Sequence, residues 1–240
     1  MVAGNDDVQA RITGFWSKIA PAYDAHAGNV PARDSAEHAA WVDAIREVLP
    51  PAPSDVLDVA TGTGFVAVIA AAIGHRVTAI DASSAMLEQA RARAQGEGVA
   101  VALHAGDAVE PTFAPESFDA ITSRHFIWTL REPERAFRNW RALLRPGGRV
   151  VAIDGFWFPP PVDGEDVRGD EGPPGLFEEH YSKETRAALP AIHATSVEPI
   201  VELFRSAGFS SVAASDLAKV HALAEDAPGS DPWYVITATR

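Results

Sequence analysis

Short apolar runs alternate with helical patterns through the middle of the chain. The apolar runs of strand length are residues 56–59, 76–80, 99–103, 118–122 and 149–153. Apolar positions at helical spacing between these runs predict helices over residues 64–73, 84–94 and 133–144. This alternation favours a doubly wound α/β fold, in which helices cover both faces of a mainly parallel sheet.

Two segments lie outside this alternation. Residues 1–14 are polar and are predicted to be mobile, but residues 35–49 have the apolar spacing of an amphipathic helix. We therefore predict an N-terminal helical cap over residues 10–50. Residues 155–195 break the pattern with proline-rich and acidic stretches, which predicts an inserted lid or substrate segment.

The last part of the chain returns to regular patterns. Thr195 and Glu198 have the spacing of a capping box, which predicts the start of a helix. Apolar runs at residues 211–216 and 233–238 predict two final strands that pair as an antiparallel hairpin. With these strands the sheet has seven members, and we predict a single domain over residues 1–240.

The first apolar run leads into a glycine turn and then into a helix. Gly62 and Gly64 permit a tight turn and let a ligand approach the backbone closely. Asp81 ends the next apolar run, about 20 residues later, where a ribose-binding carboxylate is expected. Strand, glycine turn and helix together predict a nucleotide-type cofactor site. Because residues 62–67 also fit G-x-G-x-x-A, a nicotinamide-dependent oxidoreductase stays open as an alternative.

An additional carboxylate distinguishes this turn. Asp58 lies at the end of the strand, just before the glycines. A negative charge there would repel a pyrophosphate but would attract a cationic ligand. S-adenosylmethionine carries a sulfonium and an ammonium group. The competing interpretation is that Asp58 only caps the turn that follows it.

Four stretches in the expected order carry a resemblance to a known family. They are residues 56–64, 77–87, 105–108 with 118–123, and 143–151. Together they resemble the motifs of class I S-adenosylmethionine-dependent methyltransferases, such as the ubiquinone/menaquinone C-methyltransferases and the small-molecule methyltransferases of natural-product pathways. The resemblance covers about residues 15–154. One departure is Ala60, which stands where the family has its first glycine.

The resemblance implies a Rossmann-like methyltransferase fold, S-adenosyl-L-methionine as cofactor, and methyl transfer to an oxygen, nitrogen or carbon atom of a small acceptor in secondary or quinone-like metabolism. It also implies that Asp58 holds the methionine end indirectly, Asp81 accepts the ribose hydroxyls and Asp107 accepts the adenine amino group. The implied cofactor-binding residues are Tyr23, Asp58, Ala60, Thr61, Gly62, Asp81, Ala82, Met86, Asp107, Ala108, Ser123 and Arg124. Asp81 could also cap the next helix, and Asp107 could belong to a turn.

Two histidines are candidate general bases. His125 follows the fourth strand, close to where the resemblance places the methyl group, and His180 lies on the inserted segment. Either could deprotonate an acceptor. A histidine bonded to the backbone, for His125, and an exposed polar residue, for His180, are the alternatives. His193 is a weaker candidate, and the spacing of these residues predicts no metal site.

Aromatic residues outside the helical stripes are candidates for the substrate cavity. Trp16, Tyr23 and Trp128 could either line it or belong to the core. Aromatic residues on the two covering segments favour a partly apolar or cyclic substrate. They are Phe15, Trp16, Phe156, Trp157, Phe177 and Tyr181.

Composition limits the classes of binding partner and the cellular location that we expect. A net charge of −13 argues against a nucleic acid as partner, and no apolar run approaches the length of a membrane span. The chain has no cysteine and no secretory pattern at its start, so the cytoplasm is the expected location. A monomer or a homodimer, and a non-catalytic cofactor-binding protein on the same fold, remain open.

Overall fold

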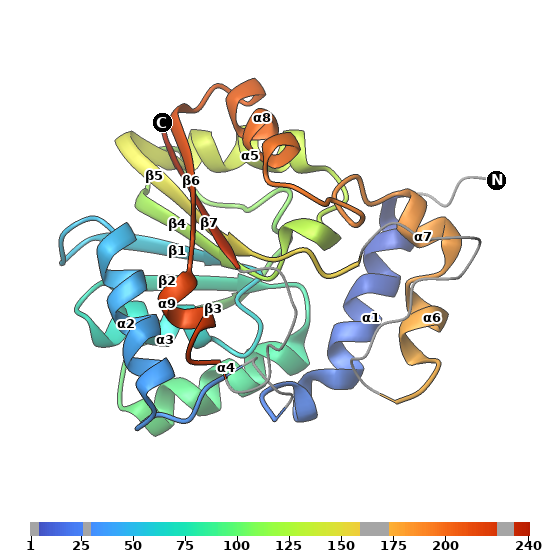
Figure 1. Cartoon of the computed structure of the whole chain (residues 1–240), viewed down its shortest axis with the longest axis horizontal. Coiled ribbons are helices and arrows are strands. Elements are labelled where there is room, and N and C mark those ends of the chain that lie inside the picture. Colours follow the sequence, from blue (N-terminus) through green and yellow to red (C-terminus); the bar gives the residue numbers. More distant parts are fainter. Residues whose placement is uncertain (1–4, 26–29, 159–172, 225–232) are drawn as a thin grey trace.

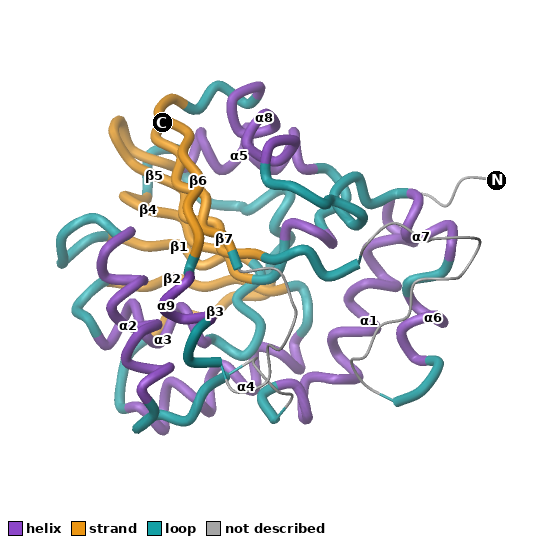
Figure 2. Tube along the Cα trace, viewed as in Figure 1, coloured by secondary structure: helices purple, strands orange, loops and turns teal. Residues whose placement is uncertain are grey.

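The strands in the described part of the protein form one seven-stranded sheet in the order β3-β2-β1-β4-β5-β7-β6 (Figures 1 and 2). The structure is a computed structural model, and it describes residues 5–25, 30–158, 173–224 and 233–240. The strands are β1 Asp55–Val59, β2 Arg76–Asp81, β3 Val101–Ala105, β4 Phe118–Arg124, β5 Leu144–Asp154, β6 Ser210–Asp216 and β7 Tyr234–Thr239.

The sheet reverses its direction of growth between β1 and β4. Strands β1 to β5 are parallel, whereas β7 pairs antiparallel with both β5 and β6. Because β1 and β4 are neighbours whose connections leave in opposite directions, their carboxyl ends border a crevice, the usual ligand position in such sheets. The predicted fold class, including the antiparallel C-terminal pair, is confirmed.

Helices cover both faces of the sheet and its carboxyl edge (Figure 1). The helices are α1 Asn5–Tyr23, α2 Ala36–Val48, α3 Phe65–Ala72, α4 Ser84–Glu97, α5 Pro133–Leu143, α6 Leu176–His180, α7 Lys183–Ala187, α8 Glu198–Ser206 and α9 Ala218–His221. Helices α5 and α8 bury their apolar faces in one core cluster, and α2 and α3 bury theirs in a second cluster on the opposite face. Strand residues alternate between the two clusters, as the period of a strand requires.

Helix α1 stands beside the sheet rather than on a face of it (Figure 2). It packs on α4 and α6, and Val8, Ile12, Phe15 and Ile19 are buried along one side of it. This i, i+4, i+7, i+11 spacing is that of an amphipathic helix. The predicted mobility of residues 1–14 is therefore wrong for the described part of that segment, because its few apolar residues share one face.

Two other local predictions need correction, and a third stays a prediction. Strand β3 begins two residues later than predicted, because α4 continues to Glu97 and ends at Gly98, whose φ is +66°. The capping box is wrong, since the N-cap of α8 is Val197 and no side chain caps that helix. The predicted lid at residues 155–195 contains α6 and α7, but residues 159–172 lie outside the described part of the chain.

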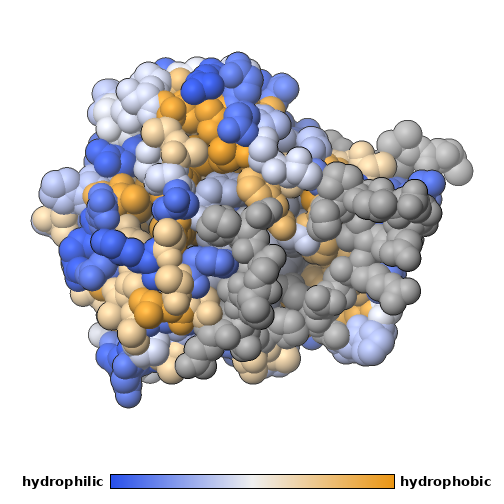
Figure 3. Space-filling model, in the orientation of Figure 1, coloured by the Kyte–Doolittle hydropathy of each residue, from blue (hydrophilic) through white to orange (hydrophobic). Residues whose placement is uncertain are grey.

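The described surface has the mixed character of an ordinary protein surface. On the face shown in Figure 3, hydrophilic residues surround smaller groups of hydrophobic ones. Among the described residues, no helix combines the length and the hydrophobicity needed to span a lipid bilayer.

Candidate functional site

A cavity opens at the carboxyl edge of the sheet, where β1 and β4 lie side by side. It has a volume of about 960 Å³ with its open mouth included. Its walls are the turn after β1, the ends of β2 and β4, the segment after β3, and α1. All the predicted cofactor-binding residues except Ser123 line it, and Ser123 is buried with 1% of its surface exposed.

Asp58 lies at the bottom of this cavity, at the end of β1. Its carboxylate accepts hydrogen bonds from the Thr61 hydroxyl at 2.6 Å and from the Thr122 hydroxyl at 2.5 Å. Burial is the main cause that raises the pKa of Asp58 to about 6, against the lowering effect of the two hydroxyls. Asp58 thus braces the turn, as the capping interpretation proposed, and also places a negative charge at the cavity wall. Thr122 was missed, although β1–β4 pairing aligns it with Asp58.

The turn after β1 has positive backbone torsions at three positions. Ala60 has a φ of +52°, Gly62 of +55° and Gly64 of +82°. A Cβ atom at Gly62 would meet no atom within 4 Å, whereas one at Gly64 would lie 2.9 Å from the Cβ of Ala90 on α4. Gly62 therefore leaves the backbone open to the cavity, and Gly64 allows α3 and α4 to approach each other.

Asp81, at the end of β2, is tied to the same turn. One carboxylate oxygen accepts from the backbone N–H of Gly62 and the other from that of Ser83, both at 2.8 Å. Burial raises the pKa of Asp81, while these N–H groups counteract the shift. The N-cap of α4 is Ser83, whose hydroxyl accepts from the Met86 N–H at 3.2 Å. Asp81 is therefore not the helix cap, and its remaining lone pairs can accept bonds from a ligand.

Asp107 lies in the segment after β3, which also lines the cavity. Its Oδ1 accepts from the Val109 N–H at 2.8 Å, so the turn interpretation holds for that oxygen. Its Oδ2 accepts from the guanidinium of Arg131, a residue that sequence analysis missed. The segment is held in place by Trp140, whose indole N–H donates to the carbonyl of Ala108 at 2.7 Å.

A positive charge lies at the end of β4. The guanidinium of Arg124 stands over the ring of Phe65 at 4.6 Å and over that of Trp41 at 5.2 Å from their centroids. Burial is the main cause that lowers the pKa of Arg124 from its ordinary value. An arginine remains protonated at such a site. Arg124 and Asp58 thus bring opposite charges to one end of the cavity.

His125 has the environment of a neutral imidazole. It lines the cavity, has a φ of +53°, and its ring lies 4.6 Å from that of Trp157 and 5.5 Å from that of Trp233. Burial, followed by the charge of Arg124, lowers its pKa well below the ordinary value. Its buried Nε2 has no hydrogen-bond partner among the described residues. The backbone-bonded alternative is therefore not what the structure shows for this nitrogen.

His180 does not reach the cavity. Its Nδ1 lies 2.9 Å from the carbonyl oxygen of Arg11 and its Nε2 lies 2.9 Å from Nζ of Lys18. Both ring nitrogens are thus engaged on the outer side of α1. His193 is likewise placed elsewhere, with its Nδ1 3.2 Å from the carbonyl oxygen of Phe158. Of the candidate bases, the structure brings only His125 to the cavity wall.

A buried carboxylate that sequence analysis missed supports His125. Asp154, at the end of β5, accepts from the backbone N–H groups of Phe126 at 3.0 Å and Ile127 at 2.7 Å. It also accepts from the indole N–H of Trp157 at 2.7 Å. Burial raises the pKa of Asp154 to about 6. Asp154 thereby fixes the turn that presents His125, a role visible only once β4 and β5 are paired.

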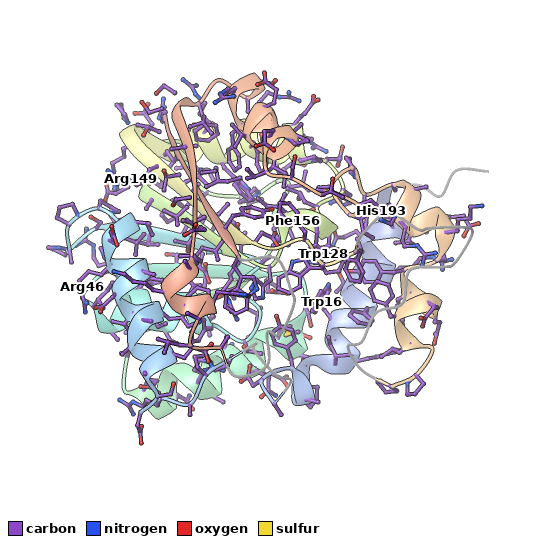
Figure 4. The ribbon with its side chains drawn as sticks, in the orientation of Figure 1. Trp16, Arg46, Trp128, Arg149, Phe156 and His193 are labelled. Carbon is purple, nitrogen blue, oxygen red and sulfur yellow. The ribbon has the colours of Figure 1, made fainter. Side chains whose placement is uncertain are left out.

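The aromatic residues separate into cavity and core positions. Trp16 and Tyr23 line the cavity, but Trp128 is buried beside Trp16, at 6.1 Å between ring centroids (Figure 4). The hydroxyl of Tyr181 accepts from the Trp16 indole N–H at 2.9 Å and so fixes that ring. Phe15, Phe177 and Tyr181 belong to the buried cluster, and they support the wall instead of forming it.

Comparison with known proteins identifies this part of the chain. Residues 57–152 match a family model described as a methyltransferase domain. This part of the chain is therefore similar to a methyltransferase domain. The match includes Asp58, Asp81, Asp107 and His125, whereas Tyr23 and the rest of α1 precede it.

Curated relatives extend this similarity beyond the matched residues. A demethylmenaquinone methyltransferase of Clavibacter sepedonicus is 38% identical over 115 residues, which cover 48% of this chain and 46% of the relative. The ubiquinone/menaquinone biosynthesis C-methyltransferase UbiE of Ruegeria sp. (strain TM1040) is 32% identical over 150 residues, which cover 60% of this chain and 58% of the relative. The chain thus spans about half to three fifths of the length of these relatives.

A solved structure shows that the similarity of fold extends beyond the matched residues. An S-adenosylmethionine-dependent methyltransferase of Mesorhizobium loti aligns with a TM-score of 0.60 at 22% identity, over 84% of this chain and 98% of that one. The family match and the relatives support the recognition of a class I S-adenosylmethionine-dependent methyltransferase with that cofactor. The nicotinamide-dependent alternative is not favoured.

Proposed function

We propose that the protein transfers the methyl group of S-adenosylmethionine to an oxygen, nitrogen or carbon nucleophile of a small-molecule acceptor. The observation that carries this proposal is that Asp58, Asp81 and Asp107, from three separate connections, line one cavity. Three carboxylates at these places suit the three polar parts of the cofactor, which are the cationic methionine end, the ribose hydroxyls and the adenine amino group.

The residues around the cavity fit this cofactor in detail. The open space at Gly62 allows the backbone to approach a ligand, and Asp81 accepts from the same residue. The negative charge of Asp58 would attract the positive charge of the methionine end, and the positive charge of Arg124 would attract its carboxylate. Met86, which is buried and lines the cavity, supplies apolar surface for the adenine ring.

The sulfonium of the bound cofactor supplies an electrophilic methyl group. The protein has to orient the acceptor in line with the breaking bond and to exclude water. Neutral His125 can accept a proton from a hydroxyl or amine acceptor, because its Nε2 has no partner among the described residues. Helix α1 covers the cavity and presents Trp16 to it.

The acceptor that we propose is a small, partly apolar molecule of quinone-like or secondary metabolism. Trp16 and Tyr23 in the lining support this class, and the printed names of the relatives refer to ubiquinone and menaquinone biosynthesis. The net charge of −13 disfavours a nucleic acid. We further propose that the protein acts in the cytoplasm as a monomer or homodimer.

Calorimetric titration tests the cofactor half of this proposal. S-adenosylmethionine should bind, and NADH should not. Asp81→Ala should weaken binding at least tenfold, because it removes the acceptor for the ribose hydroxyls. Asp216→Ala, which removes a carboxylate from the exposed end of β6, is the matched control and should leave the dissociation constant unchanged. Binding of NADH without binding of S-adenosylmethionine would reject the proposal.

A transfer assay tests the catalytic half. Incubation with methyl-labelled cofactor and a panel of phenols, amines, carboxylates and quinols should label at least one acceptor. His125→Ala should lower turnover of a hydroxyl or amine acceptor while cofactor affinity stays within twofold. Equal turnover in both proteins would exclude His125 as a base. Cofactor binding without label in any acceptor would instead support a non-catalytic cofactor-binding protein.

A further inference from the structure

Arg131 connects three parts of the molecule that meet at one wall of the cavity. It lies in the connection between β4 and α5, and its side chain is only 8% exposed. Its Nη2 donates to Asp107, its Nη1 donates to Glu132 at 2.8 Å, and its Nε donates to the side-chain carbonyl of Gln9 on α1 at 2.8 Å. Every nitrogen of the guanidinium therefore has an assigned acceptor from a different residue.

These contacts fix the orientation of the Asp107 carboxylate. The Val109 N–H holds one oxygen and Arg131 holds the other. Donors on both oxygens prevent rotation of the carboxylate plane about its last side-chain bond. Each oxygen of a carboxylate has a second lone pair, so an additional donor can still bind. Asp107, Arg131 and Gln9 all line the cavity, which leaves that lone pair accessible to a ligand.

The same contacts link this carboxylate to the cap. Gln9 lies on α1, and its amide nitrogen donates to the Thr13 hydroxyl at 3.1 Å. This bond orients the amide so that its carbonyl oxygen faces Arg131. The position of Arg131, and through it that of Asp107, therefore depends on α1 being packed against the site.

We propose that Arg131 is a positioning residue that determines specificity for the adenine amino group. It holds the Asp107 carboxylate in the orientation that accepts a hydrogen bond from that group, and it couples this orientation to the docking of α1. The proposal rests on the proposed function, because it takes S-adenosylmethionine as the ligand. It assigns to Arg131 a role in recognition beyond joining α1 to the sheet.

The neighbouring arginine offers a matched control. Arg135 lies in the first turn of α5, is 46% exposed, and pairs with Glu110 at 2.5 Å and with Glu132 at 3.5 Å. It shares Glu132 with Arg131, but among the described residues it forms no hydrogen bond or ion pair with Asp107 or α1. Arg135→Met thus removes the same chemical group from the same ion-pair network without touching the proposed recognition.

The decisive measurement is a selectivity ratio between two ligands. Dissociation constants are measured for S-adenosylhomocysteine and for its 6-deamino analogue, in which hydrogen replaces the adenine amino group. In the wild-type protein the amino compound should bind at least tenfold more tightly. Arg131→Met should weaken binding of the amino compound about tenfold and binding of the analogue less than twofold. The ratio of the two dissociation constants should therefore approach one. Arg135→Met should leave both constants and the ratio unchanged.

Two further variants keep the test decisive if Arg131→Met fails to fold. Arg131→Lys retains a cation that can reach one acceptor but not three, and it should give an intermediate ratio. Gln9→Leu removes only the link to α1 and should lower the ratio by a smaller factor. A loss of affinity that is equal for both ligands in these variants would show a merely structural role and overturn the proposal.

The outcome for the wild-type protein separates this inference from the proposed function. If neither S-adenosylmethionine nor S-adenosylhomocysteine binds, the proposed function fails. If both bind but the wild-type protein does not distinguish the 6-deamino analogue, or Arg131→Met retains the full ratio, the proposed function stands and the role of Arg131 is rejected.

Discussion

Two buried carboxylates, one at the end of β1 and one at the end of β5, lower the stability of the ligand-free protein. Asp58 and Asp154 are both buried, and burial raises the pKa of each to about 6. An ordinary aspartate has a pKa near 4. The folded protein therefore binds more protons than the unfolded chain between about pH 4 and pH 6. Since stability falls with rising pH wherever the native state binds the extra protons, both groups destabilise the ligand-free fold at neutral pH.

We expect Asp58→Asn to stabilise the ligand-free protein and to weaken cofactor binding. A shift of about two pKa units corresponds to about 3 kcal/mol, which is the expected upper limit of the gain at pH 7. The gain should vanish below about pH 4, where Asp58 is protonated in both states. Urea unfolding at pH 4 and pH 7 measures it. A variant that is less stable than the wild type at pH 7 would contradict this explanation.

Asp58 should also make cofactor binding depend on pH. A nearby sulfonium or ammonium favours the ionised carboxylate, so affinity for S-adenosylmethionine should decline as the pH falls below about 6. The Asn variant should bind more weakly and lack this part of the dependence. Calorimetric titrations between pH 5 and pH 8 compare the two proteins. Parallel pH profiles would mean that another group is responsible.

The Ala60 substitution in the glycine turn should be mildly unfavourable for the fold. Its φ of +52° costs an alanine about 1 kcal/mol or more, whereas glycine adopts this torsion without strain. We expect Ala60→Gly to raise the free energy of unfolding by about 0.5 kcal/mol, because the added freedom of the unfolded chain offsets part of the gain. Denaturant titration measures this change, and a clear loss of stability would show that the methyl group makes contacts that outweigh the strain.

At the level of elements, the glycine turn positions α3 against α4 as well as opening the backbone to a ligand. Gly64 has a left-handed torsion and lies close to Ala90, while Gly98 also has a left-handed torsion but has open space where a Cβ would lie. The two positions share the conformational requirement but differ in packing. Alanine variants at the two positions therefore separate the cost of backbone strain from the cost of the close contact with α4.

We expect Gly64→Ala to destabilise the protein by about 3 kcal/mol and Gly98→Ala by about 1 kcal/mol. Both alanines meet the strain of a left-handed torsion, but only the first also forces α4 away, because its Cβ would lie 2.9 Å from that of Ala90. Chemical unfolding of both variants gives the difference. Equal losses would show that the helices separate at no cost.

For the whole molecule, the proposed function requires α1 to stay docked at the edge of the sheet. Arg93 on α4 links the turn after β1 to the end of α1. It donates to the carbonyl of Thr63 at 2.9 Å and to Asp24, just after α1, at 2.5 Å. The hydroxyls of Ser17 and Ser83 lie 2.8 Å apart at the same boundary. These contacts hold the cap over the cavity that the sheet forms.

We expect Arg93→Met to increase the dissociation rate of S-adenosylhomocysteine about tenfold. Loss of two hydrogen bonds, one of them to a carboxylate, loosens the cap over the cavity. Hydrogen exchange of α1 should accelerate in the same variant, while that of β4 should not. Arg91→Met, an exposed position on the same helix, is the control. Unchanged dissociation together with unchanged exchange would remove Arg93 from this role.

The sequence by itself determined the parallel sheet, the glycine turn and the carboxylates at strand ends, because each depends on residues that are close along the chain. Apolar runs set the strands, and Gly62, Asp58 and Asp81 follow them at fixed distances. These are local relations between neighbouring elements, and strand order in a doubly wound sheet brings their ends to one crevice.

Tertiary structure decided which of the remaining side chains meet. Thr122, Arg131 and Asp154 have no local motif, and they join the site because β4 packs between β1 and β5 and because α1 folds back on α4. The same packing left His180 outside the cavity and brought His125 to its wall. Contacts between residues far apart in the chain depend on how the elements pack, and the periodicity of one segment carries no information about its partner.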